Sequence, residues 1–197
     1  MTSLVLTGCL VNGKMGYSDP VADRPYHHGD LRRALLDAAV LQLETTSVSE
    51  LSLRALARRI GVSHAAPAHH FGDKAGLIEA ISREGYIGLR QALSDAWEEG
   101  ASFLDVGVSY VAWAVGHPVH YRLMFGAESE KPGDLDDVRS ATRELLYGPA
   151  AQLSGDKDVA LAGWAMAHGL AQLLIDGQVK DRRSVKRLAT EVLSKLA

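Results

Sequence analysis

The stretch LSLRALARRIGVSHAAPAHHF, residues 51–71, decides the fold of this chain. Before Gly61 the apolar residues recur at helical spacing and form one stripe, with Ser52 placed to cap the helix. Ala57 is small, as a close helix crossing requires, and Gly61 accepts the positive backbone angle of a tight turn. Ser63 is expected to cap a second short helix. The pattern predicts a helix-turn-helix.

In such an element, the first residues of the second helix meet base edges in the major groove. The expected DNA-binding residues there are Ser63, His64, Ala65, Ala66, His69 and His70. Alanine can pack against a thymine methyl group, and histidine can donate to or accept from a base edge. A compact helical hairpin in an ordinary core has a similar pattern, so the turn alone leaves both interpretations open.

The rest of the chain also has apolar residues at helical spacing, which predicts an all-α protein. Asp30 is expected to cap the first helix and Asp73 a long helix that ends near Trp97. Gly76, Gly85 and Gly88 interrupt this long helix and offer it places to bend. Further helices are expected over residues 101–115, 119–125, 135–153, 159–176 and 183–196.

Composition sets the class of protein. The chain has 197 residues, 47% hydrophobic and 23% charged, and a net charge of −3. Its only cysteine is Cys9, so an intramolecular disulfide is excluded, and no apolar run reaches the roughly 20 residues of a membrane span. Between Arg24 and Arg90 the chain has nine basic and seven acidic residues, and this weak excess of positive charge favours DNA contact. Residues 1–25 are expected to be an extension, with Met15 as an alternative start. The apolar stretch 4–11 has no basic residue before it, and Lys14 follows it, so a signal peptide is not expected.

Three blocks together resemble the N-terminal domain of TetR/AcrR regulators: YHHGDLRRALLDAA (26–39), LSLRALARRIGVS (51–63) and HAAPAHHFGDKAGL (64–77). WAMAHG (164–169) resembles the Trp-His-Gly (WHG) signature of one TetR subgroup. The resemblance implies a DNA-binding domain over 26–72 and a helical effector-binding and dimerisation domain over 73–197. It also implies a cytoplasmic homodimer, a repressor that binds operator double-stranded DNA and is released from it by a small, apolar effector molecule.

The resemblance assigns roles to single residues. Lys74 matches a family lysine that contacts phosphate, and Arg54 is placed for a phosphate or a guanine edge. Ala68 stands where the family usually has tyrosine, so one contact is expected to be missing. Pro67 lies about four residues beyond Ser63, in the first turn where proline is tolerated. Both departures lower the expected DNA affinity.

Two residue sets are expected in the C-terminal half. Small and apolar residues on one face of the helix from residue 159 predict a dimer interface, namely Ala160, Gly163, Ala167, Leu170 and Leu174. Bulky apolar and polar groups predict a pocket for a small, largely apolar effector. Its residues are Trp113, His117, Tyr121, Met124, Phe125, Trp164 and His168. An ordinary aromatic core has the same composition, and a histidine such as His168 is more often a hydrogen-bonded core residue.

No cofactor, metal or enzymatic activity is expected. His117 and His120 share a helix face, but no cysteine or carboxylate completes a zinc set, and His69 and His70 point in different directions. No phosphate loop, nucleophile–histidine arrangement or paired catalytic carboxylates are evident. Two alternatives stay open from the sequence: a constitutive DNA-binding protein without an effector, and a helical enzyme or protein-interaction module.

Overall fold

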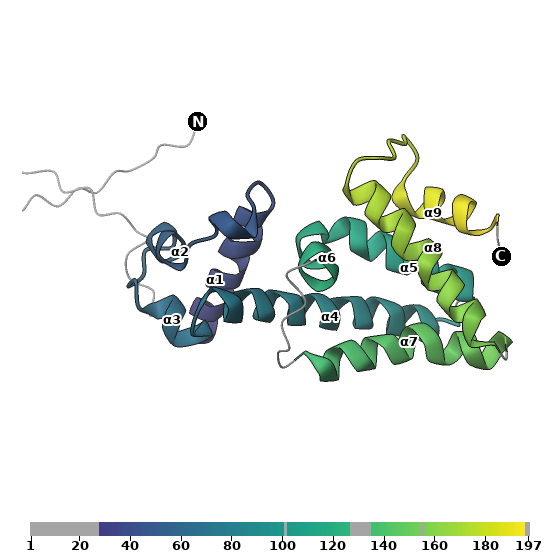
Figure 1. Ribbon diagram of the computed structural model, residues 1–197, viewed down its shortest axis with the longest axis horizontal. Coiled ribbons are helices and arrows are strands. Elements are labelled where there is room, and N and C mark those ends of the chain that lie inside the picture. The colour runs from purple at the N-terminus through teal and green to yellow at the C-terminus, as the bar shows by residue number, and fades with distance from the viewer. Residues whose placement is uncertain (1–27, 101, 127–134, 155, 196–197) are drawn as a thin grey trace, which may run out of the picture.

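The structure, a computed structural model, describes residues 28–100, 102–126, 135–154 and 156–195. The predicted extension 1–25 and Met15 lie outside the described residues. All regular elements of the described part are helices, which confirms the predicted all-α class (Figure 1). They are α1 (His28–Leu43), the 3-10 turn η1 (Val48–Glu50), α2 (Leu53–Arg59), α3 (Ala66–Phe71), α4 (Lys74–Glu98), α5 (Phe103–Gly116), α6 (Pro118–Phe125), α7 (Asp136–Ser154), α8 (Lys157–Ile175) and α9 (Val185–Leu193).

Most predicted helix ends agree with the structure because the capping residues act locally. Asp73 accepts a hydrogen bond from the Gly76 amide at 2.9 Å and begins α4. Asp30, however, does not cap the first helix: it lies inside α1, whose described part already begins at His28. An acidic residue also stabilises the first turn of a helix through its dipole, so the sequence pattern fits both positions.

Two hydrophobic cores meet along α4. The first core joins α1, η1 and α2 to Leu77, Ile78 and Ile81 of α4. The second core contains the remainder of α4, from Tyr86 to Ala96, and residues of α5 to α9. Figure 1 shows α4 running from one group of helices into the other. The predicted boundary after residue 72 therefore marks the start of a helix that both cores share.

Helix α6 also contributes to both cores, although it is only eight residues long. Val119 and Leu123 are buried in the first core, whereas Tyr121 and Met124 are buried in the second. The helix is tied to α4 by two side-chain bonds: Ser82 Oγ donates to the Leu123 carbonyl at 3.3 Å, and Tyr86 Oη donates to the Met124 carbonyl at 3.0 Å.

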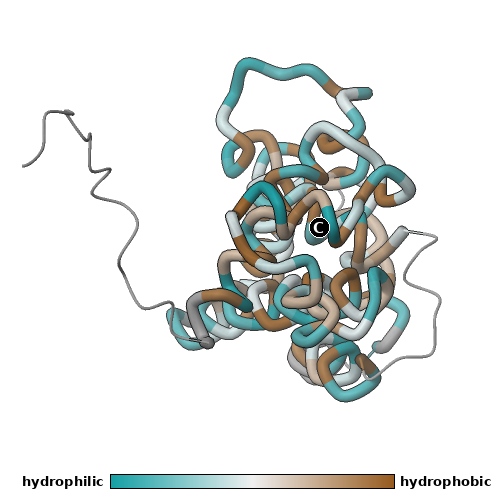
Figure 2. Tube along the Cα trace, turned by 90° about the vertical axis from the view of Figure 1, so that its left-hand side faces the viewer, coloured by the Kyte–Doolittle hydropathy of each residue, from teal (hydrophilic) through white to brown (hydrophobic). Residues whose placement is uncertain are grey.

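The glycines of α4 serve close packing. A Cβ on Gly85 would lie 2.5 Å from Met124 Sδ, and one on Gly88 would lie 3.2 Å from Trp113 Nε1. Two of the three predicted bend points are thus places where α6 and α5 approach the α4 backbone, whereas Gly76 lies against the Phe71 backbone at the end of α3. Along the other helices, hydrophobic and hydrophilic residues alternate in short stretches (Figure 2), as expected of helices with one buried face.

Helix α5 lies at the centre of the C-terminal domain and packs against α4, α8 and α9, while α7 packs against α4 and α8. Its apolar sequence fits this position, with Tyr110, Val111 and Ala114 fully buried. The cavities of the domain lie along this helix and along α7.

Candidate functional site

The helix-turn-helix is built by local chemistry. Ser52 Oγ accepts from the Ala55 amide at 3.5 Å and begins α2. Gly61 has a φ of 73°, which glycine adopts without strain, and the Val62 amide then donates to the Ala57 carbonyl at 3.0 Å. Ala57 is fully buried. The turn therefore has the geometry that the sequence predicts.

The second helix begins later than predicted, and Ser63 is not its cap. Its N-cap is Ala65, and Ser63 instead accepts a turn hydrogen bond from the Ala66 amide through its carbonyl. The reason is Pro67. With Ser63 as the cap, Pro67 would have to donate its N–H to the Ser63 carbonyl, and proline has no N–H. Starting the helix at Ala66 places Pro67 in the first turn, where amides have no partner within the helix.

Most of the predicted DNA-binding side chains lie at the surface. Arg54, Ser63, His64, Ala65 and His69 are exposed, and Ala66, His70 and Lys74 are half-buried. Ala68 is also exposed, so the small side chain leaves open surface where the family usually has tyrosine. Pro67 is fully buried and fixes α3 on the domain. The exposed surface of the helix-turn-helix therefore carries two histidines, His64 and His69, with the small side chains of Ala65 and Ala68 between them.

Lys74 has a structural contact within the chain. Its ammonium group donates to the Val48 carbonyl at 2.8 Å and to the Ser49 carbonyl at 3.1 Å. These carbonyls belong to η1, which the sequence pattern did not reveal, so this role was missed. The predicted phosphate contact would add to this role.

The predicted effector residues fall into two groups. The first group surrounds His168: its ring centre lies 5.3 Å from Tyr121, 4.9 Å from Phe125 and 5.5 Å from Trp164. His168 Nδ1 lies 2.8 Å from the hydroxyl of Tyr110 and 3.0 Å from that of Tyr121, and Tyr121 also donates to the His168 carbonyl at 3.2 Å. Tyr110 completes this network and was missed, because its place on α5 is not evident from spacing.

Burial decides the charge of this first group. It lowers the pKa of the His168 imidazole and raises the pKa of the Tyr110 and Tyr121 phenols. All three groups are therefore neutral at neutral pH. The site offers hydrogen bonds but no charge.

The second group lies on the other side of α5, against α4. The rings of Trp113 and His117 are stacked 4.8 Å apart, and His117 is exposed. His120 of α6 lies beside His117, with ring centres 6.0 Å apart. Desolvation, with smaller contributions from His117 and Arg33, lowers the pKa of His120 to about 4. Trp113 and His117 line neither of the two cavities described next.

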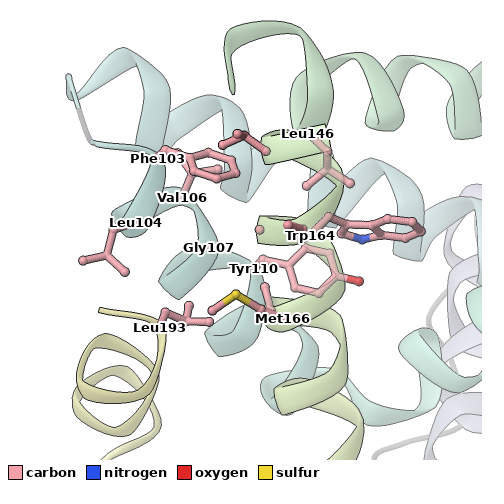
Figure 3. A pocket seen from close by; sticks show the side chains of 13 residues that line it. Phe103, Leu104, Val106, Gly107, Tyr110, Leu146, Trp164, Met166 and Leu193 are labelled. Carbon is pink, nitrogen blue, oxygen red and sulfur yellow. The ribbon is translucent and has the colours of Figure 1, made fainter. Parts of the chain in front are cut away.

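The described residues of the C-terminal domain form two cavities that bear on the predicted effector site. The apolar cavity, about 270 Å³, lies between α5, α8 and α9 and is lined by residues such as Phe103, Leu104, Met166 and Leu193 (Figure 3). The arginine cavity, about 360 Å³, lies between α4, α6, α7 and α8. Its lining is Tyr86, Met124, Phe125, Arg139, Thr142, Arg143, Leu146, Tyr147 and Trp164. Trp164 lines both cavities, and Arg139 and Arg143 are functional candidates that the sequence analysis missed.

Most of the predicted dimer face is buried inside the chain, and Gly163 and Leu174 are half-buried. Ala160 is 0% exposed, Ala167 2% and Leu170 8%, and a Cβ on Gly163 would lie 2.4 Å from the Phe103 ring. Leu174 also packs against the second core. The small residues therefore let α8 approach α5 within one chain, and this interface prediction needs correction. The opposite face of α8 carries the exposed residues Leu161 and Leu173.

Comparison with known proteins identifies both parts of the chain. Residues 35–81 match the model of bacterial regulatory proteins of the tetR family, and residues 103–196 match that of the tetracyclin repressor-like C-terminal domain. The HTH-type transcriptional regulator BetI of Paraburkholderia xenovorans is 36% identical over 183 residues, which are 83% of this chain and 92% of that relative.

Solved structures agree with this result. A protein of unknown function from Rhodococcus sp. RHA1 is 36% identical, with a TM-score of 0.71 over 88% of this chain and 96% of that one. The TetR family transcriptional regulator PfmR from Thermus thermophilus shares the fold, with 22% identity and a TM-score of 0.63 over 81% and 94% of the two chains. With its helix-turn-helix and its helical C-terminal domain, the chain belongs to the TetR family and is a DNA-binding transcriptional regulator.

Proposed function

We propose that this regulator is a cytoplasmic homodimeric repressor that leaves its operator when a small, largely apolar effector occupies the C-terminal cavities. The observation that carries the proposal is α6, which contributes buried side chains to both hydrophobic cores. A ligand that moves Tyr121, Met124 or Phe125 also moves Val119 and Leu123, because all five lie on one short helix. The effector site is thereby coupled to the DNA-binding unit.

The operator contacts follow from exposure. His64, Ala65 and His69 read base edges from the exposed start of α3, and Arg54 neutralises a phosphate or contacts guanine. Ser63, Ala66, His70 and Lys74 complete the contact set at the margins of this surface. The Trp164–His168–Gly169 segment supports membership of the WHG subgroup. Within it, Trp164 lines both cavities, and His168 belongs to the tyrosine network.

The dimer is proposed to form through the outer face of α8. In the described part of the chain, one helix is long and apolar enough to cross a membrane, Asp158–Ile175, and only 22% of that window is buried. Its exposed positions follow helical spacing through Leu161, Ala162, Ala165, Leu173 and Asp176. Small and apolar residues there favour a second copy of α8, packed as in a four-helix bundle with a twofold axis.

The proposed mechanism is a shift in population between two conformations of the dimer that differ in the position of α6. An effector that prefers a displaced α6 also displaces α4, through the Ser82 and Tyr86 hydrogen bonds to α6. Because α4 begins directly after the recognition helix, the spacing of the two recognition helices in the dimer changes. The coupling is reciprocal, so operator DNA weakens effector binding by the same factor.

A titration tests the proposal. Fluorescence anisotropy with a labelled duplex from the region upstream of the gene measures DNA affinity, and a thermal-shift screen of apolar metabolites finds ligands. We expect salt-dependent DNA binding by a dimer, and weaker DNA binding with each stabilising ligand. Ligands that stabilise the protein and leave DNA affinity unchanged would favour a constitutive DNA-binding protein. Failure to bind any duplex at low salt would contradict operator binding.

A further inference from the structure

The apolar cavity between α5, α8 and α9 has an uncharged lining. Three of the side chains that line it are aromatic, Phe103, Tyr110 and Trp164, and Met166 adds a flexible apolar side chain. No acidic, basic or histidine side chain is among the described residues that line this cavity. Figure 3 shows the hydroxyl of Tyr110 pointing away from Leu193 of α9. A ligand in the cavity therefore meets mainly ring faces and aliphatic groups.

We infer that the apolar cavity binds an uncharged aromatic compound of one or two rings, and that Tyr110 transmits this binding to α6 through His168. The inference rests on the proposed effector function. It names the chemical class of the ligand, places the ligand between α5, α8 and α9, and gives its route to the DNA-binding unit. The cavity has a volume of about 270 Å³. An apolar protein cavity of about 150 Å³ binds benzene, so this one has room for a second ring.

Desolvation selects against charged ligands in this cavity. A carboxylate or ammonium group that enters it loses its hydration and finds no side chain of opposite charge among the described residues of the lining. An uncharged aromatic ring loses little on leaving water and gains offset or edge-to-face contacts with Phe103 and Trp164. The lining therefore favours uncharged rings over acids and amines of the same size.

The seam between α8 and α9 gives the ligand access to the cavity. Helix α9 packs much more extensively against α5 than against α8. Its contact with α5 is close, since a Cβ on Gly107 would lie 3.2 Å from Leu193 Cδ1. Val159 of α8 lines the cavity and is 45% exposed, so the cavity reaches the surface on the α8 side.

Tyr110 connects the cavity to α6. Its ring lines the cavity, and its hydroxyl oxygen lies 2.8 Å from His168 Nδ1. The same nitrogen lies 3.0 Å from the Tyr121 hydroxyl, which donates to the His168 carbonyl at 3.2 Å. Tyr110 is 1% and Tyr121 0% exposed, so water does not replace a lost bond, and the three side chains respond as one network. A ligand that displaces the Tyr110 ring thus shifts Tyr121, and with it α6.

Three probes with the same ring system test the ligand class on the full-length protein: naphthalene, 1-naphthoate and 1-naphthylmethylammonium, titrated by calorimetry. We expect naphthalene to bind, and both charged probes to bind at least about tenfold more weakly, because each would bury an unpaired charge. Failure of naphthalene to bind, or equal affinity for 1-naphthoate, would overturn the inference.

Substitutions that fill the cavity locate the ligand. Met166→Trp and, at a second half-buried position of the lining, Leu104→Trp should each lower naphthalene affinity at least about tenfold, because the added indole occupies the space of the ligand. Ile87→Trp is the matched control, since Ile87 is 46% exposed on α4 and lines neither cavity. It should keep the native affinity. Native affinity in both filling variants, with melting curves that show them folded, would place naphthalene elsewhere and overturn the inference.

Two further variants test the route through His168. Tyr110→Phe and Tyr121→Phe each keep the ring and remove one hydroxyl of the network. The readout is the ratio of naphthalene affinities without and with saturating operator duplex, which cancels any change in the affinity itself. We expect a ratio of about 5–150 in the native protein, the usual range of allosteric coupling, and of less than about threefold in both variants.

Thr190→Val is the control for these two variants, because it removes an exposed hydroxyl that donates within α9. It should keep the native ratio. A native ratio in Tyr110→Phe would show that the signal does not pass through the Tyr110 hydroxyl and would overturn this route.

The same titrations separate the inference from the proposed function. If 1-naphthoate binds as tightly as naphthalene and releases DNA, the ligand class is wrong and effector release stands. If naphthalene binds in the cavity and leaves DNA affinity unchanged, the ligand class stands, whereas the route and effector release both fail.

Discussion

The recognition unit and α8 show how differently two functional surfaces are specified by one sequence. At the recognition unit, the cap at Ser52, the positive φ at Gly61 and the missing N–H of Pro67 act over a few residues. On α8, two faces with small or apolar residues lie on opposite sides of the helix, and the packing of α5 and α7 decides which one is buried. Local chemistry sets the first surface, and tertiary packing sets the second. The predictions below test this difference.

The largest effect is expected at the outer face of α8. The double change Leu161→Glu and Leu173→Glu places two charges on each side of the proposed twofold contact, where they are desolvated without a partner. We expect light scattering to show a mass of one chain at micromolar concentration, and operator affinity to fall by two orders of magnitude or more, because half-sites are then bound separately.

Leu41→Glu is the control, since this leucine on α1 is 50% exposed and lies outside α8. It should leave the mass of the dimer unchanged. A double variant that still has the mass of two chains would show that the dimer uses another surface.

How much the sequence can predict follows from this comparison. The all-α class, the helix-turn-helix and most helix ends follow from caps, turns and 3.6-residue spacing, which depend on neighbouring residues. Spacing cannot choose between the Ala160–Gly163–Ala167 face and the Leu161–Ala165–Leu173 face, because both are small or apolar. The same holds for the cavities: Arg139 and Arg143 resemble solvated charges until α4 and α6 are placed beside them.

The next effect is expected where α6 touches α4. Gly85→Ala puts a methyl group 2.5 Å from Met124 Sδ and 3.1 Å from His120 Cβ, so the buried Met124 side chain must repack and α6 must give way slightly. We expect the free energy of unfolding to fall by about 1–3 kcal/mol, the usual cost of overpacking. Chemical denaturation measures the change.

Gly116→Ala is the matched control, because a Cβ there meets no atom within 4 Å. It should leave stability unchanged or slightly raised, since alanine favours the helix. If Gly85→Ala were also neutral, the close approach of α6 would not constrain α4, and the proposed route from effector to DNA would lose its support.

A smaller effect separates two cations of the DNA-binding unit. Arg54 is exposed, and no hydrogen bond or ion pair of its side chain is found among the described residues. Arg54→Ala should therefore weaken DNA binding several-fold by removing a contact with DNA. It should also reduce the slope of log affinity against log salt by about 0.9, without a change in melting temperature. Lys74→Ala should lower the melting temperature as well, because it removes two hydrogen bonds to the carbonyls of η1.

Measuring the salt dependence of DNA affinity and the melting temperature for both variants separates the DNA contact of each residue from its structural role. A stable Lys74→Ala protein with weaker DNA binding would mean that Lys74 acts through phosphate alone. An unchanged salt slope for Arg54→Ala would mean that this residue meets no phosphate.

The smallest effect concerns acid stability near His120. The pKa of His120 is lowered to about 4 in the folded chain, mainly by desolvation, against an ordinary value of about 6.5 in the unfolded chain. The unfolded state therefore binds the proton first as the pH falls, and the stabilisation by neutral His120 is complete above pH 6.5 and lost progressively between about pH 6.5 and 4. Because the side chain is partly exposed, we expect a loss of about 1 kcal/mol by pH 5, a decrease in melting temperature of about 2–4 °C.

His120→Gln removes the titrating group, so the melting temperature of this variant should fall less between pH 7 and 5 than that of the native protein. Part of the pH dependence should remain because the pKa of His168 is also lowered. Parallel curves for the two proteins would show that His120 titrates equally in both states, and that the contact between α6 and α4 is more hydrated than its packing indicates.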